Sequence, residues 1–136
     1  MRMKNKDKII FPDLSYKIIG STFEVFNELG WGLSEKDYQK ALMKEFERRK
    51  IKFKREVYIP LQYKNINIGR YYADFIIEDK ILLEIKVVSR FGYVHVKQLF
   101  GYLKSAGVKL GILLYFTKEG IKYRRVLNPD INICDI

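Results

Sequence analysis

Apolar residues recur every three to four positions in the first third of the chain, which predicts two amphipathic helices. The first helix is expected to begin at Asp13, a candidate N-cap, and to end before Gly30 and Gly32. Ser34 is expected to start the second helix, with Asp37 three residues further on as a variant of the capping box. The inward stripe of this second helix consists of Tyr38, Ala41, Leu42, Phe46 and Arg49.

From residue 53 onward the apolar positions recur every second residue, which is typical of strands with one buried face. Pro60 indicates that the first strand lies at an edge of the sheet, because proline donates no ladder hydrogen bond. Gly69 indicates a bulge or bend in the second strand. Turns are expected at 64–65 and 78–80. The predicted strands are residues 53–63, 66–77 and 81–88.

A third helix is expected before Gly107, followed by a nearly continuous apolar run at 110–116. Such a run suits a strand that is buried on both faces. Residues 121–127 alternate again and predict the last strand. Because a helix separates the third and fourth strands, these two are expected to be parallel neighbours joined by a crossover. The predicted fold is therefore α/β, with the order ααβββαββ and one mixed central sheet flanked by helices. The stripe of the third helix consists of Val96, Leu99, Phe100 and Leu103.

Length and composition indicate one domain. The 136 residues are 48% apolar and 15% aromatic, which is enough for a hydrophobic core. Residues 1–12 are interpreted as a basic, flexible arm and residues 13–136 as the domain. Cys134 is the single cysteine and His95 the single histidine, which excludes an intrachain disulfide and argues against structural zinc. With no signal peptide and no apolar run of membrane-spanning length, a cytoplasmic protein is expected.

The chain is strongly basic, with 26 Lys and Arg against 16 Asp and Glu and a net charge of +10. This balance favours a polyanionic partner, because each phosphate that Lys or Arg neutralises releases condensed counterions. A Lys-rich and Ile-rich proteome would give the same charge without any such partner. The candidate contacts to nucleic acid lie in the dense basic stretch after the second helix and on the last strand, where the alternative is a solvated surface. They are Arg48, Arg49, Lys52, Lys54, Arg55, Lys122 and Arg124.

The hairpin of the second and third strands carries the candidate chemistry. Glu84 and Lys86 are two residues apart in a strand, so their side chains share one face. Asp74 interrupts the apolar pattern of the preceding strand. If Ile77 pairs with Ile81 around a three-residue loop, Asp74 lies opposite Glu84 and both carboxylates share that face. A two-residue loop would separate them.

Two converging carboxylates suit Mg²⁺ or Mn²⁺, which are hard ions that prefer oxygen ligands. Such an ion can activate water and neutralise charge on a phosphodiester. Lys86 would orient the nucleophile or stabilise the transition state. The alternative is an ordinary cross-strand salt bridge between Lys86 and either Asp74 or Glu84.

Three further polar residues are candidates for the same site. Glu35 falls on the inward stripe of the second helix, although a first-turn acid is also favoured by the helix dipole. Gln98 and Tyr102 are four residues apart on the third helix, where they could position water or phosphate. A solvent-facing Gln beside a half-buried Tyr would have the same spacing. His95, near a helix start, is interpreted as structural.

Taken together, these residues resemble the GxxExxY proteins, a branch of the PD-(D/E)XK nuclease superfamily. The signature corresponds to Gly32, Glu35 and Tyr38, and the resemblance extends from about residue 16 to about residue 128. It includes Asp74 and the segment 84–86. Further matching positions are Glu24, Val25, Glu28, Leu29, Gly30, His95, Gln98, Leu99, Tyr102, Leu103, Lys104, Gly120, Ile121, Lys122 and Arg124.

The resemblance implies a restriction-endonuclease-like fold and Mg²⁺-dependent phosphodiester cleavage by Asp74, Glu84 and Lys86. Gln98 and Tyr102 look like the Q-x-x-x-Y element of recombination-associated nucleases. The implied metal ligands are Glu35, Asp74, Glu84 and Ile85. Two positions depart from the pattern: Ala73 stands where the superfamily's proline would be, and Phe26 stands where a histidine is expected.

The expected function is a metal-dependent nuclease acting on DNA. The first alternative is a nucleic-acid-binding module that keeps the fold without efficient catalysis. The second is a protein-interaction accessory subunit whose basic surface meets an acidic protein. A homodimer is the expected assembly, because two sites would address two strands.

Overall fold

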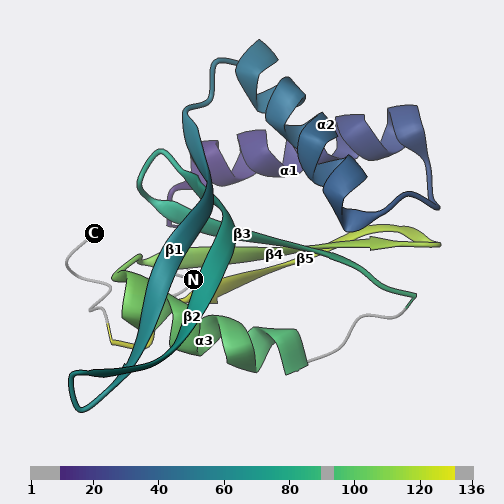
Figure 1. Cartoon of the computed structure of the whole chain (residues 1–136). Coiled ribbons are helices and arrows are strands. Elements are labelled where there is room, and N and C mark those ends of the chain that lie inside the picture. Colours follow the sequence, from purple (N-terminus) through teal and green to yellow (C-terminus); the bar gives the residue numbers. More distant parts are fainter. Residues whose placement is uncertain (1–9, 90–93, 131–136) are drawn as a thin grey trace, which may run out of the picture.

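The elements follow the predicted order within residues 10–89 and 94–130, which are the part of the chain that the computed structural model describes (Figure 1). Two helices are followed by a hairpin and a third strand, then a helix and two more strands. The bounds are α1 Pro12–Leu29, α2 Glu35–Arg48, β1 Phe53–Tyr63, β2 Ile66–Ile77, β3 Ile81–Val87, α3 Val94–Ala106, β4 Leu110–Thr117 and β5 Gly120–Leu127.

The strands form one sheet in the order β1-β2-β3-β4-β5. The pairs β1–β2, β2–β3 and β4–β5 are antiparallel, and β3–β4 is parallel. The single parallel pair is the one that α3 connects, as expected for a crossover helix. Pro60 lies on the edge strand β1, which also confirms its prediction. The mixed sheet flanked by helices confirms the predicted fold class.

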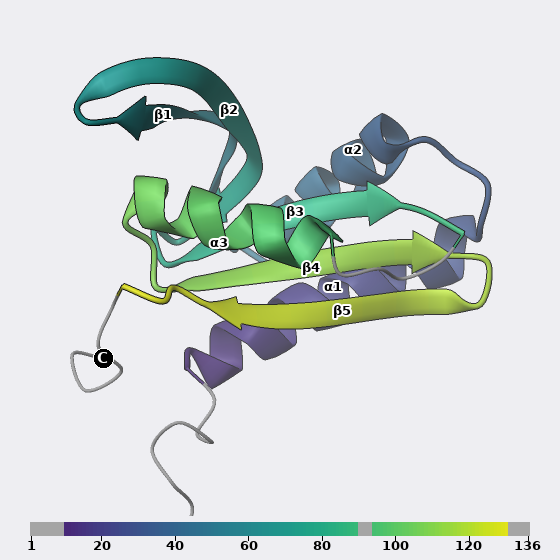
Figure 2. The same ribbon diagram turned by 90° about the horizontal axis from the view of Figure 1, so that it is seen from below.

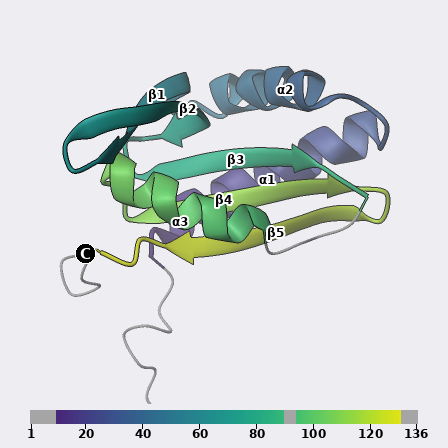
Figure 3. The same cartoon turned by 60° about the horizontal axis from the view of Figure 1, so that its bottom comes forward.

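Helices cover both faces of the sheet (Figure 3). On one face α1 and α2 bury a large apolar cluster that includes Leu42, Phe46, Leu83 and Ile85. On the other face α3 packs through Leu99 on a smaller cluster. None of the helices in the described residues combines the length and the apolar character that a membrane span requires.

The second helix starts as predicted, and the first does not. Ser34 caps α2 by accepting a hydrogen bond from the Asp37 N–H, and the Asp37 carboxylate accepts one from the Ser34 N–H, which completes the capping box. The N-cap of α1 is Phe11, not Asp13, and Pro12 occupies the first helical position. Proline suits that position because its φ is already helical and its missing N–H would be unpaired anyway. Asp13 lies in the first turn, where its charge complements the helix dipole.

The predicted N-terminal arm covers residues 1–12, of which residues 1–9 lie outside the described part. Ile10 is buried, and its carbonyl oxygen accepts a hydrogen bond from Arg125 on β5. The chain is therefore attached to the sheet two residues before α1 begins.

The β1–β2 hairpin extends beyond the rest of the sheet and curls over one end of α3 (Figure 2). We call residues 57–73 the hairpin arm. At its base, Glu56 has a φ of 51°, and at its tip Lys64 and Asn65 have φ values of 49° and 66°, as in a tight two-residue turn. The strand pairing shifts from Leu61–Gly69 to Gln62–Asn67, so the predicted irregularity near Gly69 is present.

Candidate active site

The hairpin register that the site requires is present. Ile77 pairs with Ile81 around residues 78–80, and the pairing continues through Ile76–Leu82 to Phe75–Leu83. Two successive residues of the loop, Glu78 and Asp79, adopt left-handed conformations, with φ values of 53° and 58°. The next residues in this register are Asp74 and Glu84. The three-residue loop predicted from the sequence is thus confirmed.

At Asp74 and Glu84 the hydrogen bonds between the two strands are accepted by side-chain carboxylates. The Asp74 N–H donates to Glu84 Oε2 at 3.0 Å, and the Ile85 N–H donates to Asp74 Oδ2 at 2.8 Å. Each carboxylate therefore binds the main chain of the opposite strand. These bonds fix both carboxylates side by side where β2 and β3 stop pairing.

Burial raises the free energy of keeping both carboxylates charged. Glu84 is only 5% exposed, and Asp74 is partly buried. Burial raises the pKa of Asp74 to about 6, an effect that the Ile85 N–H opposes and the Glu35 carboxylate increases. Burial, with the nearby Asp74 charge, raises the pKa of Glu84 to about 7. Additional positive charge would stabilise the ionised form of both carboxylates in such a site.

Lys86 supplies part of that charge without forming an ion pair with either acid. Its ammonium lowers the pKa of both Asp74 and Glu84 through space. Among the ion pairs found in residues 10–89 and 94–130, none joins Lys86 to these carboxylates. The simple cross-strand salt bridge considered for these residues is therefore absent, and the lysine remains available to a ligand.

The loop between α1 and α2 positions Glu35. Gly32 has a φ of 117°, which only glycine adopts easily. The Tyr38 hydroxyl donates to the Gly30 carbonyl at 2.5 Å and accepts from the Leu33 N–H at 3.3 Å. Tyr38 is fully buried and stacks on Phe116 of β4, so the start of α2 is tied to the sheet. The charge of Glu35 consequently acts on Asp74 across the gap between helix and hairpin.

The donor set fits a hard divalent cation. The two main-chain hydrogen bonds use one oxygen of each carboxylate, so the second oxygen of Asp74 and of Glu84 can ligate an ion. Ile85 could contribute only its main-chain oxygen. No compact group of three or more Asp, Glu, His or Cys side chains occurs in the described residues, so Glu35 is not part of a preformed cage. Mg²⁺ often binds through one or two carboxylates and keeps several waters, which agrees with this arrangement.

A small cavity of about 40 Å³ adjoins Glu84 on the α3 side. A volume of this size exceeds what one water needs. Gln98 and Tyr102 line it from α3, as the sequence predicted for the site, and Tyr102 stacks face to face on Tyr71 with centroids 3.4 Å apart. The remaining lining residues are Tyr71, Glu84, Lys86, His95, Leu99 and Leu113.

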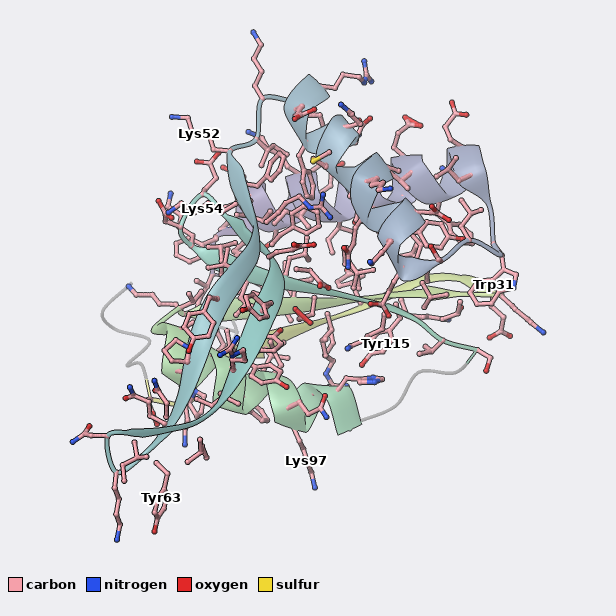
Figure 4. All side chains as sticks on the ribbon, in the orientation of Figure 1. Trp31, Lys52, Lys54, Tyr63, Lys97 and Tyr115 are labelled. Atoms are coloured by element: carbon pink, nitrogen blue, oxygen red, sulfur yellow. The ribbon has the colours of Figure 1, made fainter. Side chains whose placement is uncertain are left out.

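Sequence reasoning missed Tyr71 and Tyr115 in this neighbourhood and interpreted His95 as structural. The Tyr71 hydroxyl is buried without a hydrogen-bond partner of normal geometry in the described residues, and it faces the charge of Glu84. His95 lines the cavity, and burial together with Lys86 lowers its pKa. Tyr115 of β4 lies 3.4 Å from His95 Nδ1 through its hydroxyl, and Figure 4 labels it near the centre of the molecule. The sequence signal for Tyr71 is a tyrosine three residues before Asp74.

Most of the candidate phosphate contacts that precede β1 lie away from these carboxylates. Arg48 and Arg49 are at the far end of α2 from Glu35, about 20 Å along a 14-residue helix, and both contact Glu45. Lys54 pairs with Asp79 at 3.1 Å, and Lys52 and Lys54 point outward from the start of β1 (Figure 4).

Three basic residues lie closer to the site. Arg55 is half-buried, and its charge lowers the pKa of Asp74. Lys122 pairs across β4 with Tyr115, which pairs with Lys86. Two strand spacings put Lys122 about 10 Å from Lys86 on the same face of the sheet. Arg124 follows in the next such row, beside Leu113 and Glu84.

Comparison with protein families matches residues 12–126 to the PD-(D/E)XK nuclease superfamily. The chain belongs to this superfamily. Among solved structures, the crystal structure of SSO0001 is similar at 17% sequence identity, over 90% of this chain and 80% of that one, with a TM-score of 0.48. The comparison with curated proteins finds no match.

In this PD-(D/E)XK protein, the residues that fit the superfamily's pattern are Asp74 and the segment Glu84–Lys86. Ala73 takes the place of the proline. It is fully buried against the α3 side of the sheet and pairs with Val57, so a small side chain fits there.

Proposed function

We propose that this chain is a Mg²⁺-dependent or Mn²⁺-dependent nuclease of the GxxExxY branch that hydrolyses phosphodiester bonds in DNA. The observation that supports this most is the fixed pair of carboxylates, the partly buried Asp74 and the buried Glu84, beside Lys86, which forms no ion pair within the described residues. A stable fold has no need for two adjacent buried acids, because desolvation makes them costly. A polyanionic substrate agrees with the net charge of +10.

The proposed roles follow from the positions of the side chains. Asp74, Glu84 and the main-chain oxygen of Ile85 would hold a divalent ion, which would supply an activated water and neutralise charge on the phosphate. The Lys86 ammonium stabilises the negative charge that develops on the phosphate oxygens. Gln98 holds water at the mouth of the cavity, and Glu35 orients it from the α2 side. These assignments require the fold, because the six residues come from four separate elements.

The test is cleavage by the purified full chain with Mg²⁺, with Mn²⁺ and with EDTA. Single-stranded, duplex and branched DNA and RNA are compared as substrates. Lys86→Ala is expected to lower the rate at least about 100-fold without changing the unfolding temperature, since one such transition-state contact typically contributes that much. The matched control is Lys97→Ala, an exposed lysine of α3 that points away from the rest of the structure (Figure 4), which is expected to leave the rate unchanged.

Absence of metal-dependent cleavage on every substrate would refute the proposal. Salt-sensitive binding without turnover would instead identify a nucleic-acid-binding module. Equal loss of activity in Lys86→Ala and Lys97→Ala would remove the special role of Lys86.

A further inference from the structure

The outer face of the hairpin arm displays two tyrosine rings. Tyr58 of β1 and Tyr72 of β2 are directly paired across the strands, with ring centroids 5.6 Å apart. They are 47% and 49% exposed. Rings of this size that remain half in water have large apolar surfaces without a partner in the described part of the chain.

The inner face of the same arm is held in place. Val57, Ile59, Tyr71 and Ala73 belong to the apolar cluster beneath α3, and the Tyr71 ring stacks on Tyr102. Because strand side chains alternate between faces, this packing forces Tyr58 and Tyr72 outward. The two exposed rings are therefore presented by a strand pair that is anchored on its other side.

The arm is also positively charged. From residue 57 to residue 73 the sequence contains no Asp or Glu, and it contains Lys64 and Arg70. Arg70 is exposed and lies on the same face of β2 as Tyr72, two residues away. The first carboxylates along the arm are those of Glu56 and Asp74, where it joins the sheet. A cation beside exposed aromatic rings is the combination that binds nucleic acid with unpaired bases.

The tyrosine pair is continuous with the proposed catalytic centre. Tyr72 precedes Asp74 by two residues, which is about 7 Å along a strand. Arg70 and Tyr72 share the outer face of the arm, whereas the facing changes at Asp74, because Ala73 packs in the cluster beneath α3 and Phe75 in the cluster beneath α1 and α2. A single strand that runs from Asp74 along the arm reaches Tyr72 first and Arg70 next.

A second copy of the chain is a poorer occupant of this arm. β1 is an edge strand, but Pro60 lies in its middle and the pairing of β1 with β2 shifts after Leu61. Proline and a bulge are features that prevent one edge strand from pairing with another. An acidic protein would use the charge of the arm but would leave the rings unexplained.

We infer that the outer face of the hairpin arm binds unpaired bases by stacking on Tyr58 and Tyr72, so that the substrate is DNA with a single-stranded segment. This inference rests on the proposed nuclease function, because it specifies the substrate of that site. The bases stack on the tyrosines, and Arg70 contacts the backbone phosphate. Stacking accepts any base, so sequence preference is expected to be weak.

Binding without cleavage provides the test. The affinity of the full chain for a dye-labelled oligothymidine is measured by fluorescence anisotropy in EDTA, with a duplex of equal length in parallel. Tyr58→Ala and Tyr72→Ala are each expected to weaken single-strand binding at least about 5-fold, in line with the usual contribution of one stacked base. Tyr58→Phe and Tyr72→Phe keep the ring and are expected to bind normally. Duplex binding is expected to change less in all four variants.

Two controls separate stacking from general effects. Tyr123→Ala removes a ring that is 48% exposed, but on β5, at the opposite edge of the sheet from β1. Ile68→Ser removes an apolar side chain that is 67% exposed near the tip of the arm. Both are expected to bind single strands like the unchanged chain, and circular dichroism verifies that every variant is folded.

Unchanged single-strand affinity in Tyr58→Ala and Tyr72→Ala, or an equal loss in Tyr123→Ala, would overturn the inference. A larger loss in Ile68→Ser together with lost self-association would show that the arm binds a second copy. Tyrosine-dependent binding without any cleavage would support the arm's role and count against the nuclease. Cleavage that does not depend on these tyrosines would support the nuclease and count against the arm's role.

Discussion

On β3, odd-numbered and even-numbered residues face opposite sides of the sheet and serve opposite purposes. Leu83 and Ile85 are fully buried in the apolar cluster beneath α1 and α2. Glu84 and Lys86 point to the α3 side, where a cavity and a second carboxylate adjoin them. The same strand therefore stabilises the fold through one face and holds the candidate site on the other. The difference shows that the apolar face must offset the electrostatic cost of the polar one.

The apolar face is expected to show the largest effect on stability. Leu83→Ala deletes a side chain with no exposed surface, so the free energy of unfolding should fall by about 2–5 kcal/mol. Urea denaturation monitored by circular dichroism measures it. Protein that remains folded is expected to keep its cleavage activity, because Leu83 faces away from the carboxylates. A loss below about 1 kcal/mol would contradict the role given to this face.

The neighbouring residue is expected to behave in the opposite way. Glu84→Gln keeps an oxygen for the Asp74 N–H but removes a buried charge, so at pH 8 without metal it should raise the free energy of unfolding by on the order of 1–3 kcal/mol. It should also abolish cleavage. Thermal unfolding and a cleavage assay on the same preparation measure both. A lower free energy of unfolding for Glu84→Gln at pH 8 would show that the buried Glu84 charge does not destabilise the folded chain.

The pH dependence of stability follows from the same pair. The folded pKa of Glu84, about 7, lies above the ordinary value of 4.5, so the folded chain holds a proton that the unfolded chain releases. The free energy of unfolding of the unchanged chain should therefore fall as pH rises from about 4 to about 7 and stay low above that. Glu84→Gln should flatten this slope. At pH 8, saturating Mg²⁺ should restore stability in the unchanged chain only.

The smallest of these effects concerns how closely α3 approaches the sheet. A Cβ added at Gly111 of β4 would lie 2.9 Å from Leu99 Cδ2 and 3.1 Å from Leu103 Cδ2. Gly111→Ala should therefore cost about 1–2 kcal/mol and slow cleavage, because displacing α3 moves Gln98. The matched control is Gly101→Ala on α3, where nothing lies within 4 Å, and a small gain in stability is expected. Equal stability and equal cleavage rates of the two variants would contradict the idea that Gly111 is needed for the close contact of α3 with the sheet.

The hairpin shows how much of the site could be predicted. A period of two fixes which residues share a face, and the loop of three residues fixes which residues are opposite, so the pairing of Asp74 with Glu84 could be predicted from the sequence alone. The capping box at Ser34 could be predicted for the same reason, since it involves residues only three apart. The predicted N-cap of α1, Asp13, was wrong because proline is favoured at the first helical position, and here Pro12 occupies it one residue before Asp13.

Local periodicity thus determined the elements, the register of the hairpin and the trio of Asp74, Glu84 and Lys86. Only the tertiary structure decided that Tyr71 and Tyr102 stack, that the Tyr115 hydroxyl lies beside His95, and that the hairpin arm curls over α3. These contacts join segments about 20 to 30 residues apart. Their geometry depends on how α3 packs on the sheet and on the bend at Glu56, and neither leaves a periodic signal in the sequence.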